Sequence, residues 1–567
     1  VLEALQALSP FPVRDKSGVF IGARMGRPEK AKMRQLTGSP HTLFPVGEEG
    51  GRMRSLQSAV EKQVIRAEYP LYFCPACSAS TIFSVCERCD QKAERRYSCT
   101  LCGLLPAPCK HQPATFQAQE FPIVPALGHI LKKLGMRIPP PLVKGVRGTS
   151  NANHVIEHLA KGIIRAKHDV YVNKDGTTRY DMTQLPITHF KPKEIGTSVV
   201  RLQELGYEHD IAGKPLTGKE QVLELRPQDI ILPACPVSPD EKADDVLFRV
   251  GKCMDDLLES LYGLPPYYRF KVPADVVGHL VVVLAPHTAA GIIGRVIGFS
   301  QTQGLFAHPM LHAATRRDCD GDESCASLLL DVLINFSRQF LPSHRGSTQD
   351  TPLVITSRLN PSEVDDMVFD IDIVWKYPLE FYQACMDYKY PWEVEIERVK
   401  SRLNSDHKYD RFGFTHDTSN INAGVLCSAY KTIPTMEDKL KGQMRLAEKI
   451  RAVQTGDVAR LVIEKHFLKD IKGNLRKFSM QKFRCSTCNE SYRRPPLAGR
   501  CAKCQGTLIF TIAEGSVTKY LEPSISLAEK YDAPPYLKQT LQLLRSRVES
   551  VFGREKEKQI ALGSWFS

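Results

Sequence analysis

The most informative stretch of the chain is residues 312–323, His-Ala-Ala-Thr-Arg-Arg-Asp-Cys-Asp-Gly-Asp-Glu. Its carboxylates at Asp318, Asp320 and Asp322 recur at every second position, so an extended or tightly turned backbone can bring them to one point. Gly321 permits backbone angles that are closed to other residues and so allows a sharp turn. Converging carboxylates repel one another unless cations lie between them, and oxygen ligands select magnesium, manganese or calcium over zinc. The stretch therefore predicts a divalent-metal loop.

Two other interpretations of this loop compete with a metal site. A calcium-binding EF-hand needs glycine at its sixth position and glutamate at its twelfth. Counted from the first aspartate, these positions hold Glu323 and Leu329, which excludes an EF-hand. A solvated acidic turn is common in proteins, but apolar segments flank this loop and Arg316 and Arg317 directly precede it. Such cations can neutralise a metal loop at rest or bind phosphate in use.

A second acidic pair, Asp370-Ile-Asp372, lies in a segment that alternates like one polar face of a strand. We expect this pair to be structural.

Two segments have the sequence pattern of strands. Leu280–Leu284 has the stronger pattern, and Leu353–Thr356 is the second such segment. Within Ala326–Phe340, the apolar residues Leu329, Val332, Leu333 and Phe336 lie at helical spacing, so we expect the acidic loop to run straight into a helix.

Three further segments have helical patterns. They are Asn153–Ala166, residues 436–470 and residues 536–552. In the last, Pro534-Pro535 marks the start, and one helix face carries Leu537, Leu541, Leu544 and Val548.

The bulk composition is that of an ordinary globular protein of several domains. The chain has 567 residues, of which 42% are hydrophobic and 25% charged, and one core rarely serves more than about 250–300 residues. No apolar run approaches the roughly 20 residues needed to span a bilayer, so we expect no membrane association. The net charge of +13 suits a polyanionic partner without requiring one. The start at Val1, without an initiator methionine, leads us to expect a piece of a longer protein.

Most of the 17 cysteines fall in tight clusters, whose spacing indicates zinc ligands rather than disulfides. The first and third clusters are each a pair of CxxC knuckles, which supplies the four donors of a closed, structural zinc site. The middle cluster is a CxxC followed by Cys-Lys-His; its fourth ligand is the histidine or another donor in its place. The six remaining cysteines stand singly, which fits a reducing cytosol and a cytoplasmic protein. We therefore expect three structural zinc ions, with the ligands Cys74, Cys77, Cys86 and Cys89; Cys99, Cys102, Cys109 and His111; and Cys485, Cys488, Cys501 and Cys504.

Residues 22–34 are glycine-rich and strongly basic, so a long helix is unexpected there. A solvated loop and a phosphate-binding loop are both compatible with this composition. The five cations of the segment are Arg24, Arg27, Lys30, Lys32 and Arg34.

The string Asp-Cys-Asp-Gly-Asp at 318–322 resembles the magnesium-binding loop of the two-barrel polymerase superfamily. Longer strings narrow the resemblance to the large subunit of the archaeal D-family DNA polymerase, which the chain resembles from about residue 26 to Ser567 as a C-terminal portion. These strings are residues 285–299, 306–323, 187–196, 335–338 and 492–497.

The resemblance implies a mixed α+β multidomain fold. Its catalytic core would be a double-psi β-barrel of the two-barrel type, accompanied by zinc-binding modules and C-terminal helices. The expected division is residues 1–60, the end of a first barrel with the basic loop; 61–120, a double zinc module; 121–265, a mixed connecting domain; 266–400, the second barrel with the aspartate loop; 401–480, a helical region; 481–515, a zinc ribbon; and 516–567, C-terminal helices and tail.

The resemblance also implies roles for individual residues. The aspartates Asp318, Asp320 and Asp322 would hold two magnesium ions, with Asp318 the least certain direct ligand. Lys30, Lys32 and Arg317 would balance the charge of a triphosphate. Nucleic acid would be bound by Arg24, Arg27, Arg34 and Arg316.

The last nine residues are similar to a box that binds sliding clamps. On a single helical turn the apolar side chains would fill a pocket while the glutamine forms hydrogen bonds. Two exposed aromatic residues at a chain end favour a partner over a frayed tail. The residues concerned are Gln559, Leu562, Trp565 and Phe566.

The most concrete expectation is therefore a DNA-directed DNA polymerase catalytic subunit. Its partners would be primer–template DNA, deoxynucleoside triphosphates, a small proofreading subunit, a sliding clamp and primase. An RNA-polymerase-like enzyme is the alternative within the same class. A zinc-stabilised DNA-binding scaffold without chemistry is the alternative from another class, but it leaves three converging aspartates without a purpose.

Overall fold

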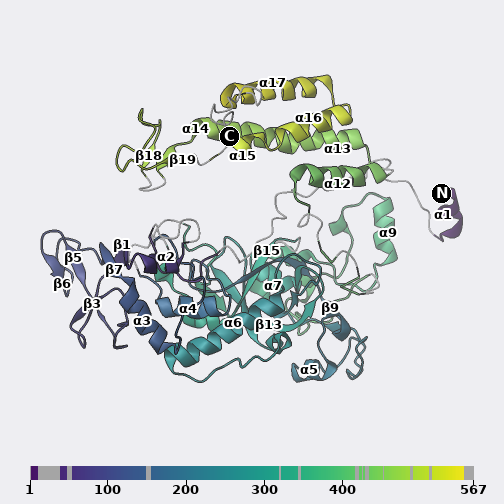
Figure 1. Ribbon diagram of the computed structural model, residues 1–567. Coiled ribbons are helices and arrows are strands. Elements are labelled where there is room, and N and C mark those ends of the chain that lie inside the picture. The colour runs from purple at the N-terminus through teal and green to yellow at the C-terminus, as the bar shows by residue number, and fades with distance from the viewer. Residues whose placement is uncertain are drawn as a thin grey trace. The chain divides into compact units, whose positions relative to one another are not determined.

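The computed structural model describes residues 2–10, 39–47, 54–148, 155–317, 321–341, 346–415, 420–423, 426–427, 433–450, 453–485, 490–509, 512 and 514–553. The chain divides into two compact units (Figure 1). One is Met33–Ser428; the other combines Val1–Lys32 with Ala429–Ser567 and contains the short helix α1 (Leu2–Leu8). Among the described residues, no helix combines the length and apolar character needed to cross a membrane.

A closed barrel of six strands forms the centre of the larger unit. The strands pair in the order β11-β14-β8-β15-β12-β13, and pairing of β11 with β13 closes the ring. Two neighbouring pairs, β11 with β13 and β14 with β8, are parallel, and the other pairs are antiparallel. The strands are β8 (Tyr180–Pro186), β11 (Asp229–Pro233), β12 (Leu280–Leu284), β13 (Ala290–Ser300), β14 (Gly304–Ala307) and β15 (Glu323–Leu328), with β16 (Val354–Thr356) added beside β13.

The barrel interior is apolar because several strands are short continuous hydrophobic runs. All residues of β11 and β14 are buried, and in β12 only Leu280 is exposed. Helix α6 (Ala243–Leu257) adds an apolar face to the same core, together with Val332 from α8 (Leu329–Asn335). The mixed α/β fold with a barrel agrees with the sequence-based expectation, as do the strands at Leu280–Leu284 and Val354–Thr356.

Two sequence-based expectations about this region are wrong. The acidic loop leads into strand β15, not directly into a helix, because residues 324–328 are buried between β12 and β8 and satisfy their backbone groups there. The helix starts only at Leu329, and Leu333, expected on its apolar face, is 65% exposed. The barrel also extends beyond residues 266–400, because long connections bring β8 and β11 back to the later strands.

The acidic pair Asp370-Ile-Asp372 is structural but does not belong to a strand. Asp370 ends a 3₁₀ turn (Asp366–Asp370), and Asp372 forms an isolated bridge with Arg398. Arg398 donates to the Asp370 carboxylate at 3.0 Å, while the Tyr377 hydroxyl donates to Asp372 at 2.8 Å. Surface pairing therefore explains both carboxylates.

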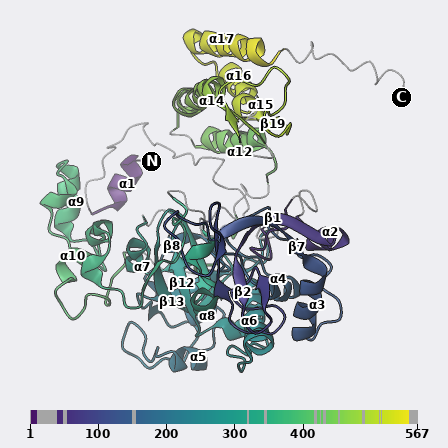
Figure 2. The ribbon, with the colours of Figure 1, turned by 90° about the vertical axis from the view of Figure 1, so that its left-hand side faces the viewer.

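The first part of the larger unit has its own core. Strands β1 (Val64–Pro70) and β7 (Phe116–Pro122) pair along seven residues each. Figure 2 shows them beside α2 (Leu56–Glu61), α3 (Ile123–Lys133) and α4 (Leu159–Lys167), which share one apolar cluster with them. The predicted helix at Asn153–Ala166 is α4; residues 151–154 lie outside the described part. Between β1 and β7 lie only short strands: β2 (Tyr72–Cys74), β3 (Ala79–Thr81), β4 (Glu94–Arg95), β5 (Tyr97–Cys99) and β6 (Gly103–Leu105).

Among the described residues, the remaining α-helices and strands of the larger unit are short. They are α5 (Val199–Glu204), β9 (His189–Phe190), β10 (Leu223–Glu224), α7 (Pro309–Ala314), α9 (Leu379–Met386) and α10 (Val399–Arg402).

The smaller unit is a helical bundle with a small three-stranded sheet (Figure 1). The predicted apolar stripe of residues 536–552 is confirmed, since Leu537, Leu541, Leu544 and Val548 are all buried in α17. Helices are also confirmed over residues 436–470, although the expected helical region from 401 contains no α-helix between α10 and Met436 among the described residues. The elements are α12 (Met436–Lys449), α13 (Thr455–Val462), a π-helical turn (Ile463–Phe467), α14 (Leu468–Met480), β17 (Phe483–Cys485), β18 (Ser491–Tyr492), β19 (Leu508–Ile509), α15 (Glu514–Thr518), α16 (Leu521–Lys530) and α17 (Pro535–Phe552).

Candidate functional site

The acidic loop connects α7 to the barrel strand β15. Helix α7 begins at His308, whose Nδ1 accepts a hydrogen bond from the Met310 amide at 3.2 Å. It ends at Thr315, whose hydroxyl donates to the His312 carbonyl at 2.7 Å. Gly321 has a φ of +98°, which is the left-handed backbone that its sequence position predicted. The loop is therefore held by an anchored helix on one side and by a barrel strand on the other.

Asp322 is the member of the aspartate triplet whose contacts the structure describes. Its carbonyl accepts from the Gln184 amide at 2.8 Å, which ties the end of the loop to β8. Its carboxylate lies 3.6 Å from the Arg317 guanidinium. The same guanidinium donates to the carbonyl of Pro286, in the turn between β12 and β13. Arg317 thus joins the acidic loop to a neighbouring hairpin, while Arg316 is exposed and forms no ion pair with the described residues.

Most of the other predicted site residues lie outside the described residues. They are Asp318, Asp320, Lys30, Lys32, Arg24, Arg27, Arg34, Cys488, Gln559, Leu562, Trp565 and Phe566.

Two buried histidines lie on α7, immediately before the loop. Burial lowers the pKa of His308 to about 3 and that of His312 to about 4. Both side chains are therefore neutral near pH 7, and the ring of His312 is hydrogen-bonded to the Leu185 carbonyl on β8 at 3.0 Å. The contact of His312 with β8 fixes α7 to the barrel, and neither histidine adds positive charge there near pH 7.

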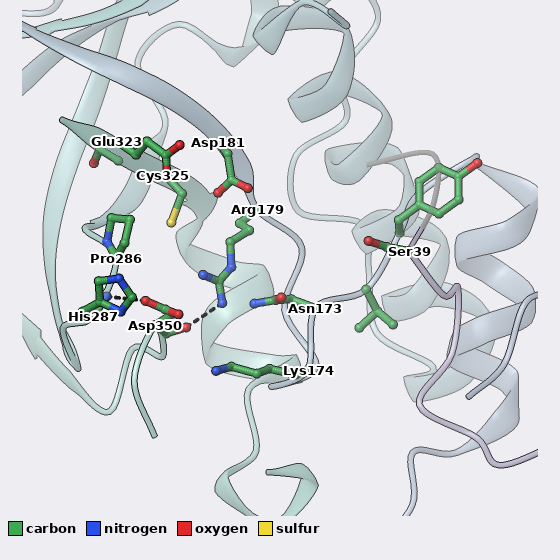
Figure 3. A pocket seen from close by; sticks show the side chains of 13 residues that line it. Ser39, Asn173, Lys174, Arg179, Asp181, Pro286, His287, Glu323, Cys325 and Asp350 are labelled. Atoms are coloured by element: carbon green, nitrogen blue, oxygen red, sulfur yellow. Dashed lines mark hydrogen bonds between the residues drawn. The ribbon is translucent and has the colours of Figure 1, made fainter. Parts of the chain in front are cut away.

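A pocket of about 530 Å³ begins at Glu323, next to Asp322 (Figure 3). Its wall carries both carboxylates and cations, and these come from segments far apart in the sequence. In Figure 3, Asp181 and Glu323 lie at one side of Arg179, and His287 and Asp350 at another. The charged and polar side chains that line it include Asn173, Lys174, Arg179, Asp181, His287, Glu323 and Asp350.

Sequence reasoning missed this pocket. Residues 173–179 were recognisable only as a polar turn, and Asp350 only as part of a turn-rich loop. Alternation in Tyr180-Asp-Met-Thr is the one local sign of a strand that places Asp181 on the same face as Thr183.

The turn that carries Lys174 and Arg179 is held by buried polar contacts. The Asp175 carboxylate accepts from the Thr177 amide at 3.0 Å and the Thr177 hydroxyl at 2.8 Å. The Thr178 amide donates to the buried Asp331 of α8 at 2.6 Å. Desolvation raises the pKa of Asp331, while Arg165 opposes this rise. A buried carboxylate with such partners fixes the backbone of the turn, because leaving it without them would be costly.

The cysteine clusters predicted from the sequence are brought together by the fold. In each of three clusters the candidate ligand atoms lie within 4.8 Å of one another. The Sγ atoms of Cys74 and Cys89 are 3.5 Å apart, and Cys102 Sγ is 3.3 Å from His111 Nδ1. The clusters are Cys74, Cys77, Cys86 and Cys89; Cys99, Cys102, Cys109 and His111; and Cys485, Cys501 and Cys504.

These donors fit zinc. Sulfur and imidazole ligands at such separations match a tetrahedral zinc site. A hydrogen bond from the Cys77 amide, the largest cause, lowers the pKa of Cys74 to about 7, toward the thiolate that binds metal. The surrounding strands have only two or three residues, so a bound ion would replace a hydrophobic core in holding them.

Comparison with known proteins covers both the barrel and the first zinc module. Residues 136–439 match the family model for the DNA polymerase II large subunit DP2, catalytic domain, and residues 1–105 match that for its central domain. The DNA polymerase II large subunit of Archaeoglobus fulgidus is 45% identical over 100% of this chain and 50% of its own length. The same subunit of Methanocella arvoryzae is 46% identical over 99% of this chain and 50% of its length. The same subunit of Pyrococcus furiosus is 42% identical over 97% of this chain and 44% of its own length.

The chain thus spans about half the length of the relatives that it matches. The match to the catalytic-domain family model nevertheless includes every strand of the closed barrel, the acidic loop and the charged residues that line the pocket beside it. The chain therefore belongs to the DNA polymerase II large subunit (DP2) family.

Proposed function

We propose that this chain carries the catalytic centre of a DNA-directed DNA polymerase, at which a nucleotide is transferred to the 3′ end of a primer on template DNA. The observation that carries the proposal is the position of the acidic loop. It follows an anchored helix, enters a barrel strand and faces a cation at Arg317, all within the match to a catalytic-domain family. The alternative of a scaffold without chemistry gives none of these features a purpose.

The barrel is proposed to be of the double-psi type. Its six-stranded closure and its two parallel neighbouring pairs support this assignment. Residues 1–60 would then be the end of a first barrel, and the pocket beside Glu323 would open toward the reacting groups.

Asp318, Asp320 and Asp322 would hold two Mg²⁺ ions, in keeping with their oxygen ligands. When bound, such a pair activates the attacking hydroxyl and stabilises the leaving pyrophosphate. Arg317 lies beside the Asp322 carboxylate and would orient it, and with Lys30 and Lys32 it would balance triphosphate charge. Arg316 is exposed and free to contact the DNA backbone, together with Arg24, Arg27 and Arg34.

The three cysteine clusters would hold structural zinc ions, with Cys488 completing the third. The tail residues Gln559, Leu562, Trp565 and Phe566 would bind a sliding clamp. A small proofreading subunit and primase complete the proposed partners.

The proposal is tested by the double variant Asp320→Ala, Asp322→Ala in the complete polymerase that contains this chain. Extension of a primer by deoxynucleotides in Mg²⁺ should be lost, while DNA binding stays within about twofold because phosphate contacts dominate affinity. The matched control is Asp370→Ala, Asp372→Ala, which removes an acidic pair of the same spacing that serves only surface contacts. Extension by the first variant at the wild-type rate would refute the assignment. Preferential incorporation of ribonucleotides would favour the RNA-polymerase-like alternative.

A further inference from the structure

Asp350 links three segments at the wall of the pocket (Figure 3). Its carboxylate accepts a hydrogen bond from the His287 amide, in the turn between β12 and β13. Its own amide donates to the Thr288 carbonyl at 2.9 Å in the same turn. Its carbonyl accepts from the Arg179 guanidinium at 2.6 Å, at the start of β8. One residue thus fastens the hairpin turn to the opposite side of the pocket.

The same hairpin turn reaches the acidic loop. The Pro286 carbonyl accepts from Arg317, and Arg317 lies 3.6 Å from the Asp322 carboxylate. A continuous series of contacts therefore runs from Arg179 through Asp350, the hairpin turn and Arg317 to Asp322. We name it the Asp350 bridge.

The backbone along this bridge is strained. Asp350 and His287 have φ values of +59° and +63°, and Arg316, directly before Arg317, has +62°. This left-handed region is uncommon for residues other than glycine, although aspartate and histidine enter it more often than most. The contacts just described hold the backbone of Asp350 and of the hairpin turn in this region. Strained residues of this kind cluster at functional sites.

We infer that Asp350 is a positioning residue for the metal-binding carboxylate of Asp322, acting through the hairpin turn and Arg317. This inference rests on the proposed function, because it assumes that Asp322 holds a divalent ion. Without the Asp350 carboxylate the His287 amide loses its acceptor and the turn can relax. The Pro286 carbonyl then no longer fixes Arg317, and Asp322 samples orientations that do not favour metal binding. Partners of this indirect kind typically contribute about 10–100-fold to metal affinity or activity.

The test uses Asp350→Gly in the complete polymerase. Glycine keeps the left-handed backbone but removes the acceptor. Two quantities are measured: the Mg²⁺ concentration that gives half-maximal primer extension, and the dissociation constant of Mn²⁺ followed by electron paramagnetic resonance. Both should rise about tenfold, while the extension rate at saturating Mg²⁺ stays within about twofold.

Two controls separate positioning from general damage. Asp350→Asn keeps an acceptor oxygen and tolerates a positive φ. In this variant both the Mg²⁺ requirement and the Mn²⁺ dissociation constant should therefore stay within about twofold of wild type. Asp532→Gly removes another left-handed aspartate with a single cationic partner, Lys538, and should change neither value. If Asp350→Gly does not fold, Arg179→Lys takes its place, because it weakens the hold on the Asp350 carbonyl and should shift both values in the same direction.

The outcomes are distinguishable from those for the proposed function. Unchanged Mn²⁺ affinity and Mg²⁺ requirement in Asp350→Gly, in a polymerase that extends primers normally, would overturn the inference alone. A lower maximal rate without any metal shift would also overturn it. Absence of Mg²⁺-dependent extension in the wild type would refute the proposed function, while a shift in Mn²⁺ affinity would still support the bridge.

Discussion

At the scale of single residues, the candidate site combines the ion pair of Arg317 and Asp322 with two uncharged histidines that hold the preceding helix. The Arg317–Asp322 pair is partly exposed, with side chains 23% and 28% accessible, so solvent weakens its contribution to folding. The main effect of this ion pair is to orient the Asp322 carboxylate. The histidines of α7, by contrast, are buried and uncharged near pH 7, and they fix the helix from which the acidic loop starts.

The buried state of His308 predicts a loss of stability in acid. Its pKa is about 3 in the folded protein against 6.5 ordinarily, so only the unfolded chain takes up a proton between these values. Its stabilising contribution is complete above pH 6.5 and is lost as the pH falls. At pH 5 the loss is about 2 kcal/mol from this residue. Calorimetry at pH 7.5 and pH 5 should show it as a fall in Tm.

The control for this prediction is His308→Asn, which retains a helix-capping side chain but does not titrate. It should lower Tm at pH 7.5 because it leaves space in the core, yet lose less between pH 7.5 and pH 5 than the wild type. Equal pH dependence in both proteins would mean that His308 is not held neutral.

At the scale of elements, the sequence predicted those parts whose pattern is local. The strand at Leu280–Leu284 and the apolar stripe of α17 follow from runs and spacings that one segment contains by itself. Strand β15 was missed because Ser-Cys-Ala-Ser-Leu has no clear period, and its conformation depends on backbone partners in β12 and β8. The pair Asp370-Ile-Asp372 showed strand alternation without a neighbouring strand to pair with.

The candidate site likewise has one part that the sequence predicts and one part that it does not. The aspartate loop is one continuous string and could be identified from the sequence. Asp350 approaches Lys174 and Asp181 only when two segments far apart in the sequence fold together, so no local pattern marks these residues. The pocket is formed by tertiary contacts, which the periodicity of a single segment does not predict.

The stripe of α17 predicts a contrast between two leucines of one helix. Leu541 is 1% exposed and packs in the core of the smaller unit, whereas Leu543 is 67% exposed. Leu541→Ala should lower the free energy of unfolding of this unit by about 2–5 kcal/mol, because it leaves a cavity. Leu543→Ala should change it by no more than about 0.5 kcal/mol. Denaturant titration of both variants would show whether the helix face is assigned correctly, and similar losses for both would contradict it.

At the scale of the whole molecule, the chain comprises two units with different sources of stability. The larger has an extensive core around the barrel, and the smaller a helical core. The cysteine clusters lie in segments whose strands are too short to bury much apolar surface, so metal binding is expected to supply part of their folding energy. The barrel, the acidic loop and the charged residues of the pocket all lie within the match to the catalytic domain.

The central claim is that divalent ions bind at the acidic loop, and replacing Mg²⁺ by Fe²⁺ tests it most directly. With added hydrogen peroxide as oxidant and ascorbate to return Fe³⁺ to Fe²⁺, hydroxyl radicals generated at the bound ion cut the polypeptide close to it. We predict cleavage within residues 318–322 and in the adjacent turn 285–289, suppressed by excess Mg²⁺ and absent from Asp320→Ala, Asp322→Ala. Cleavage confined to other segments, or cleavage at the loop that neither Mg²⁺ nor the double substitution diminishes, would contradict the account.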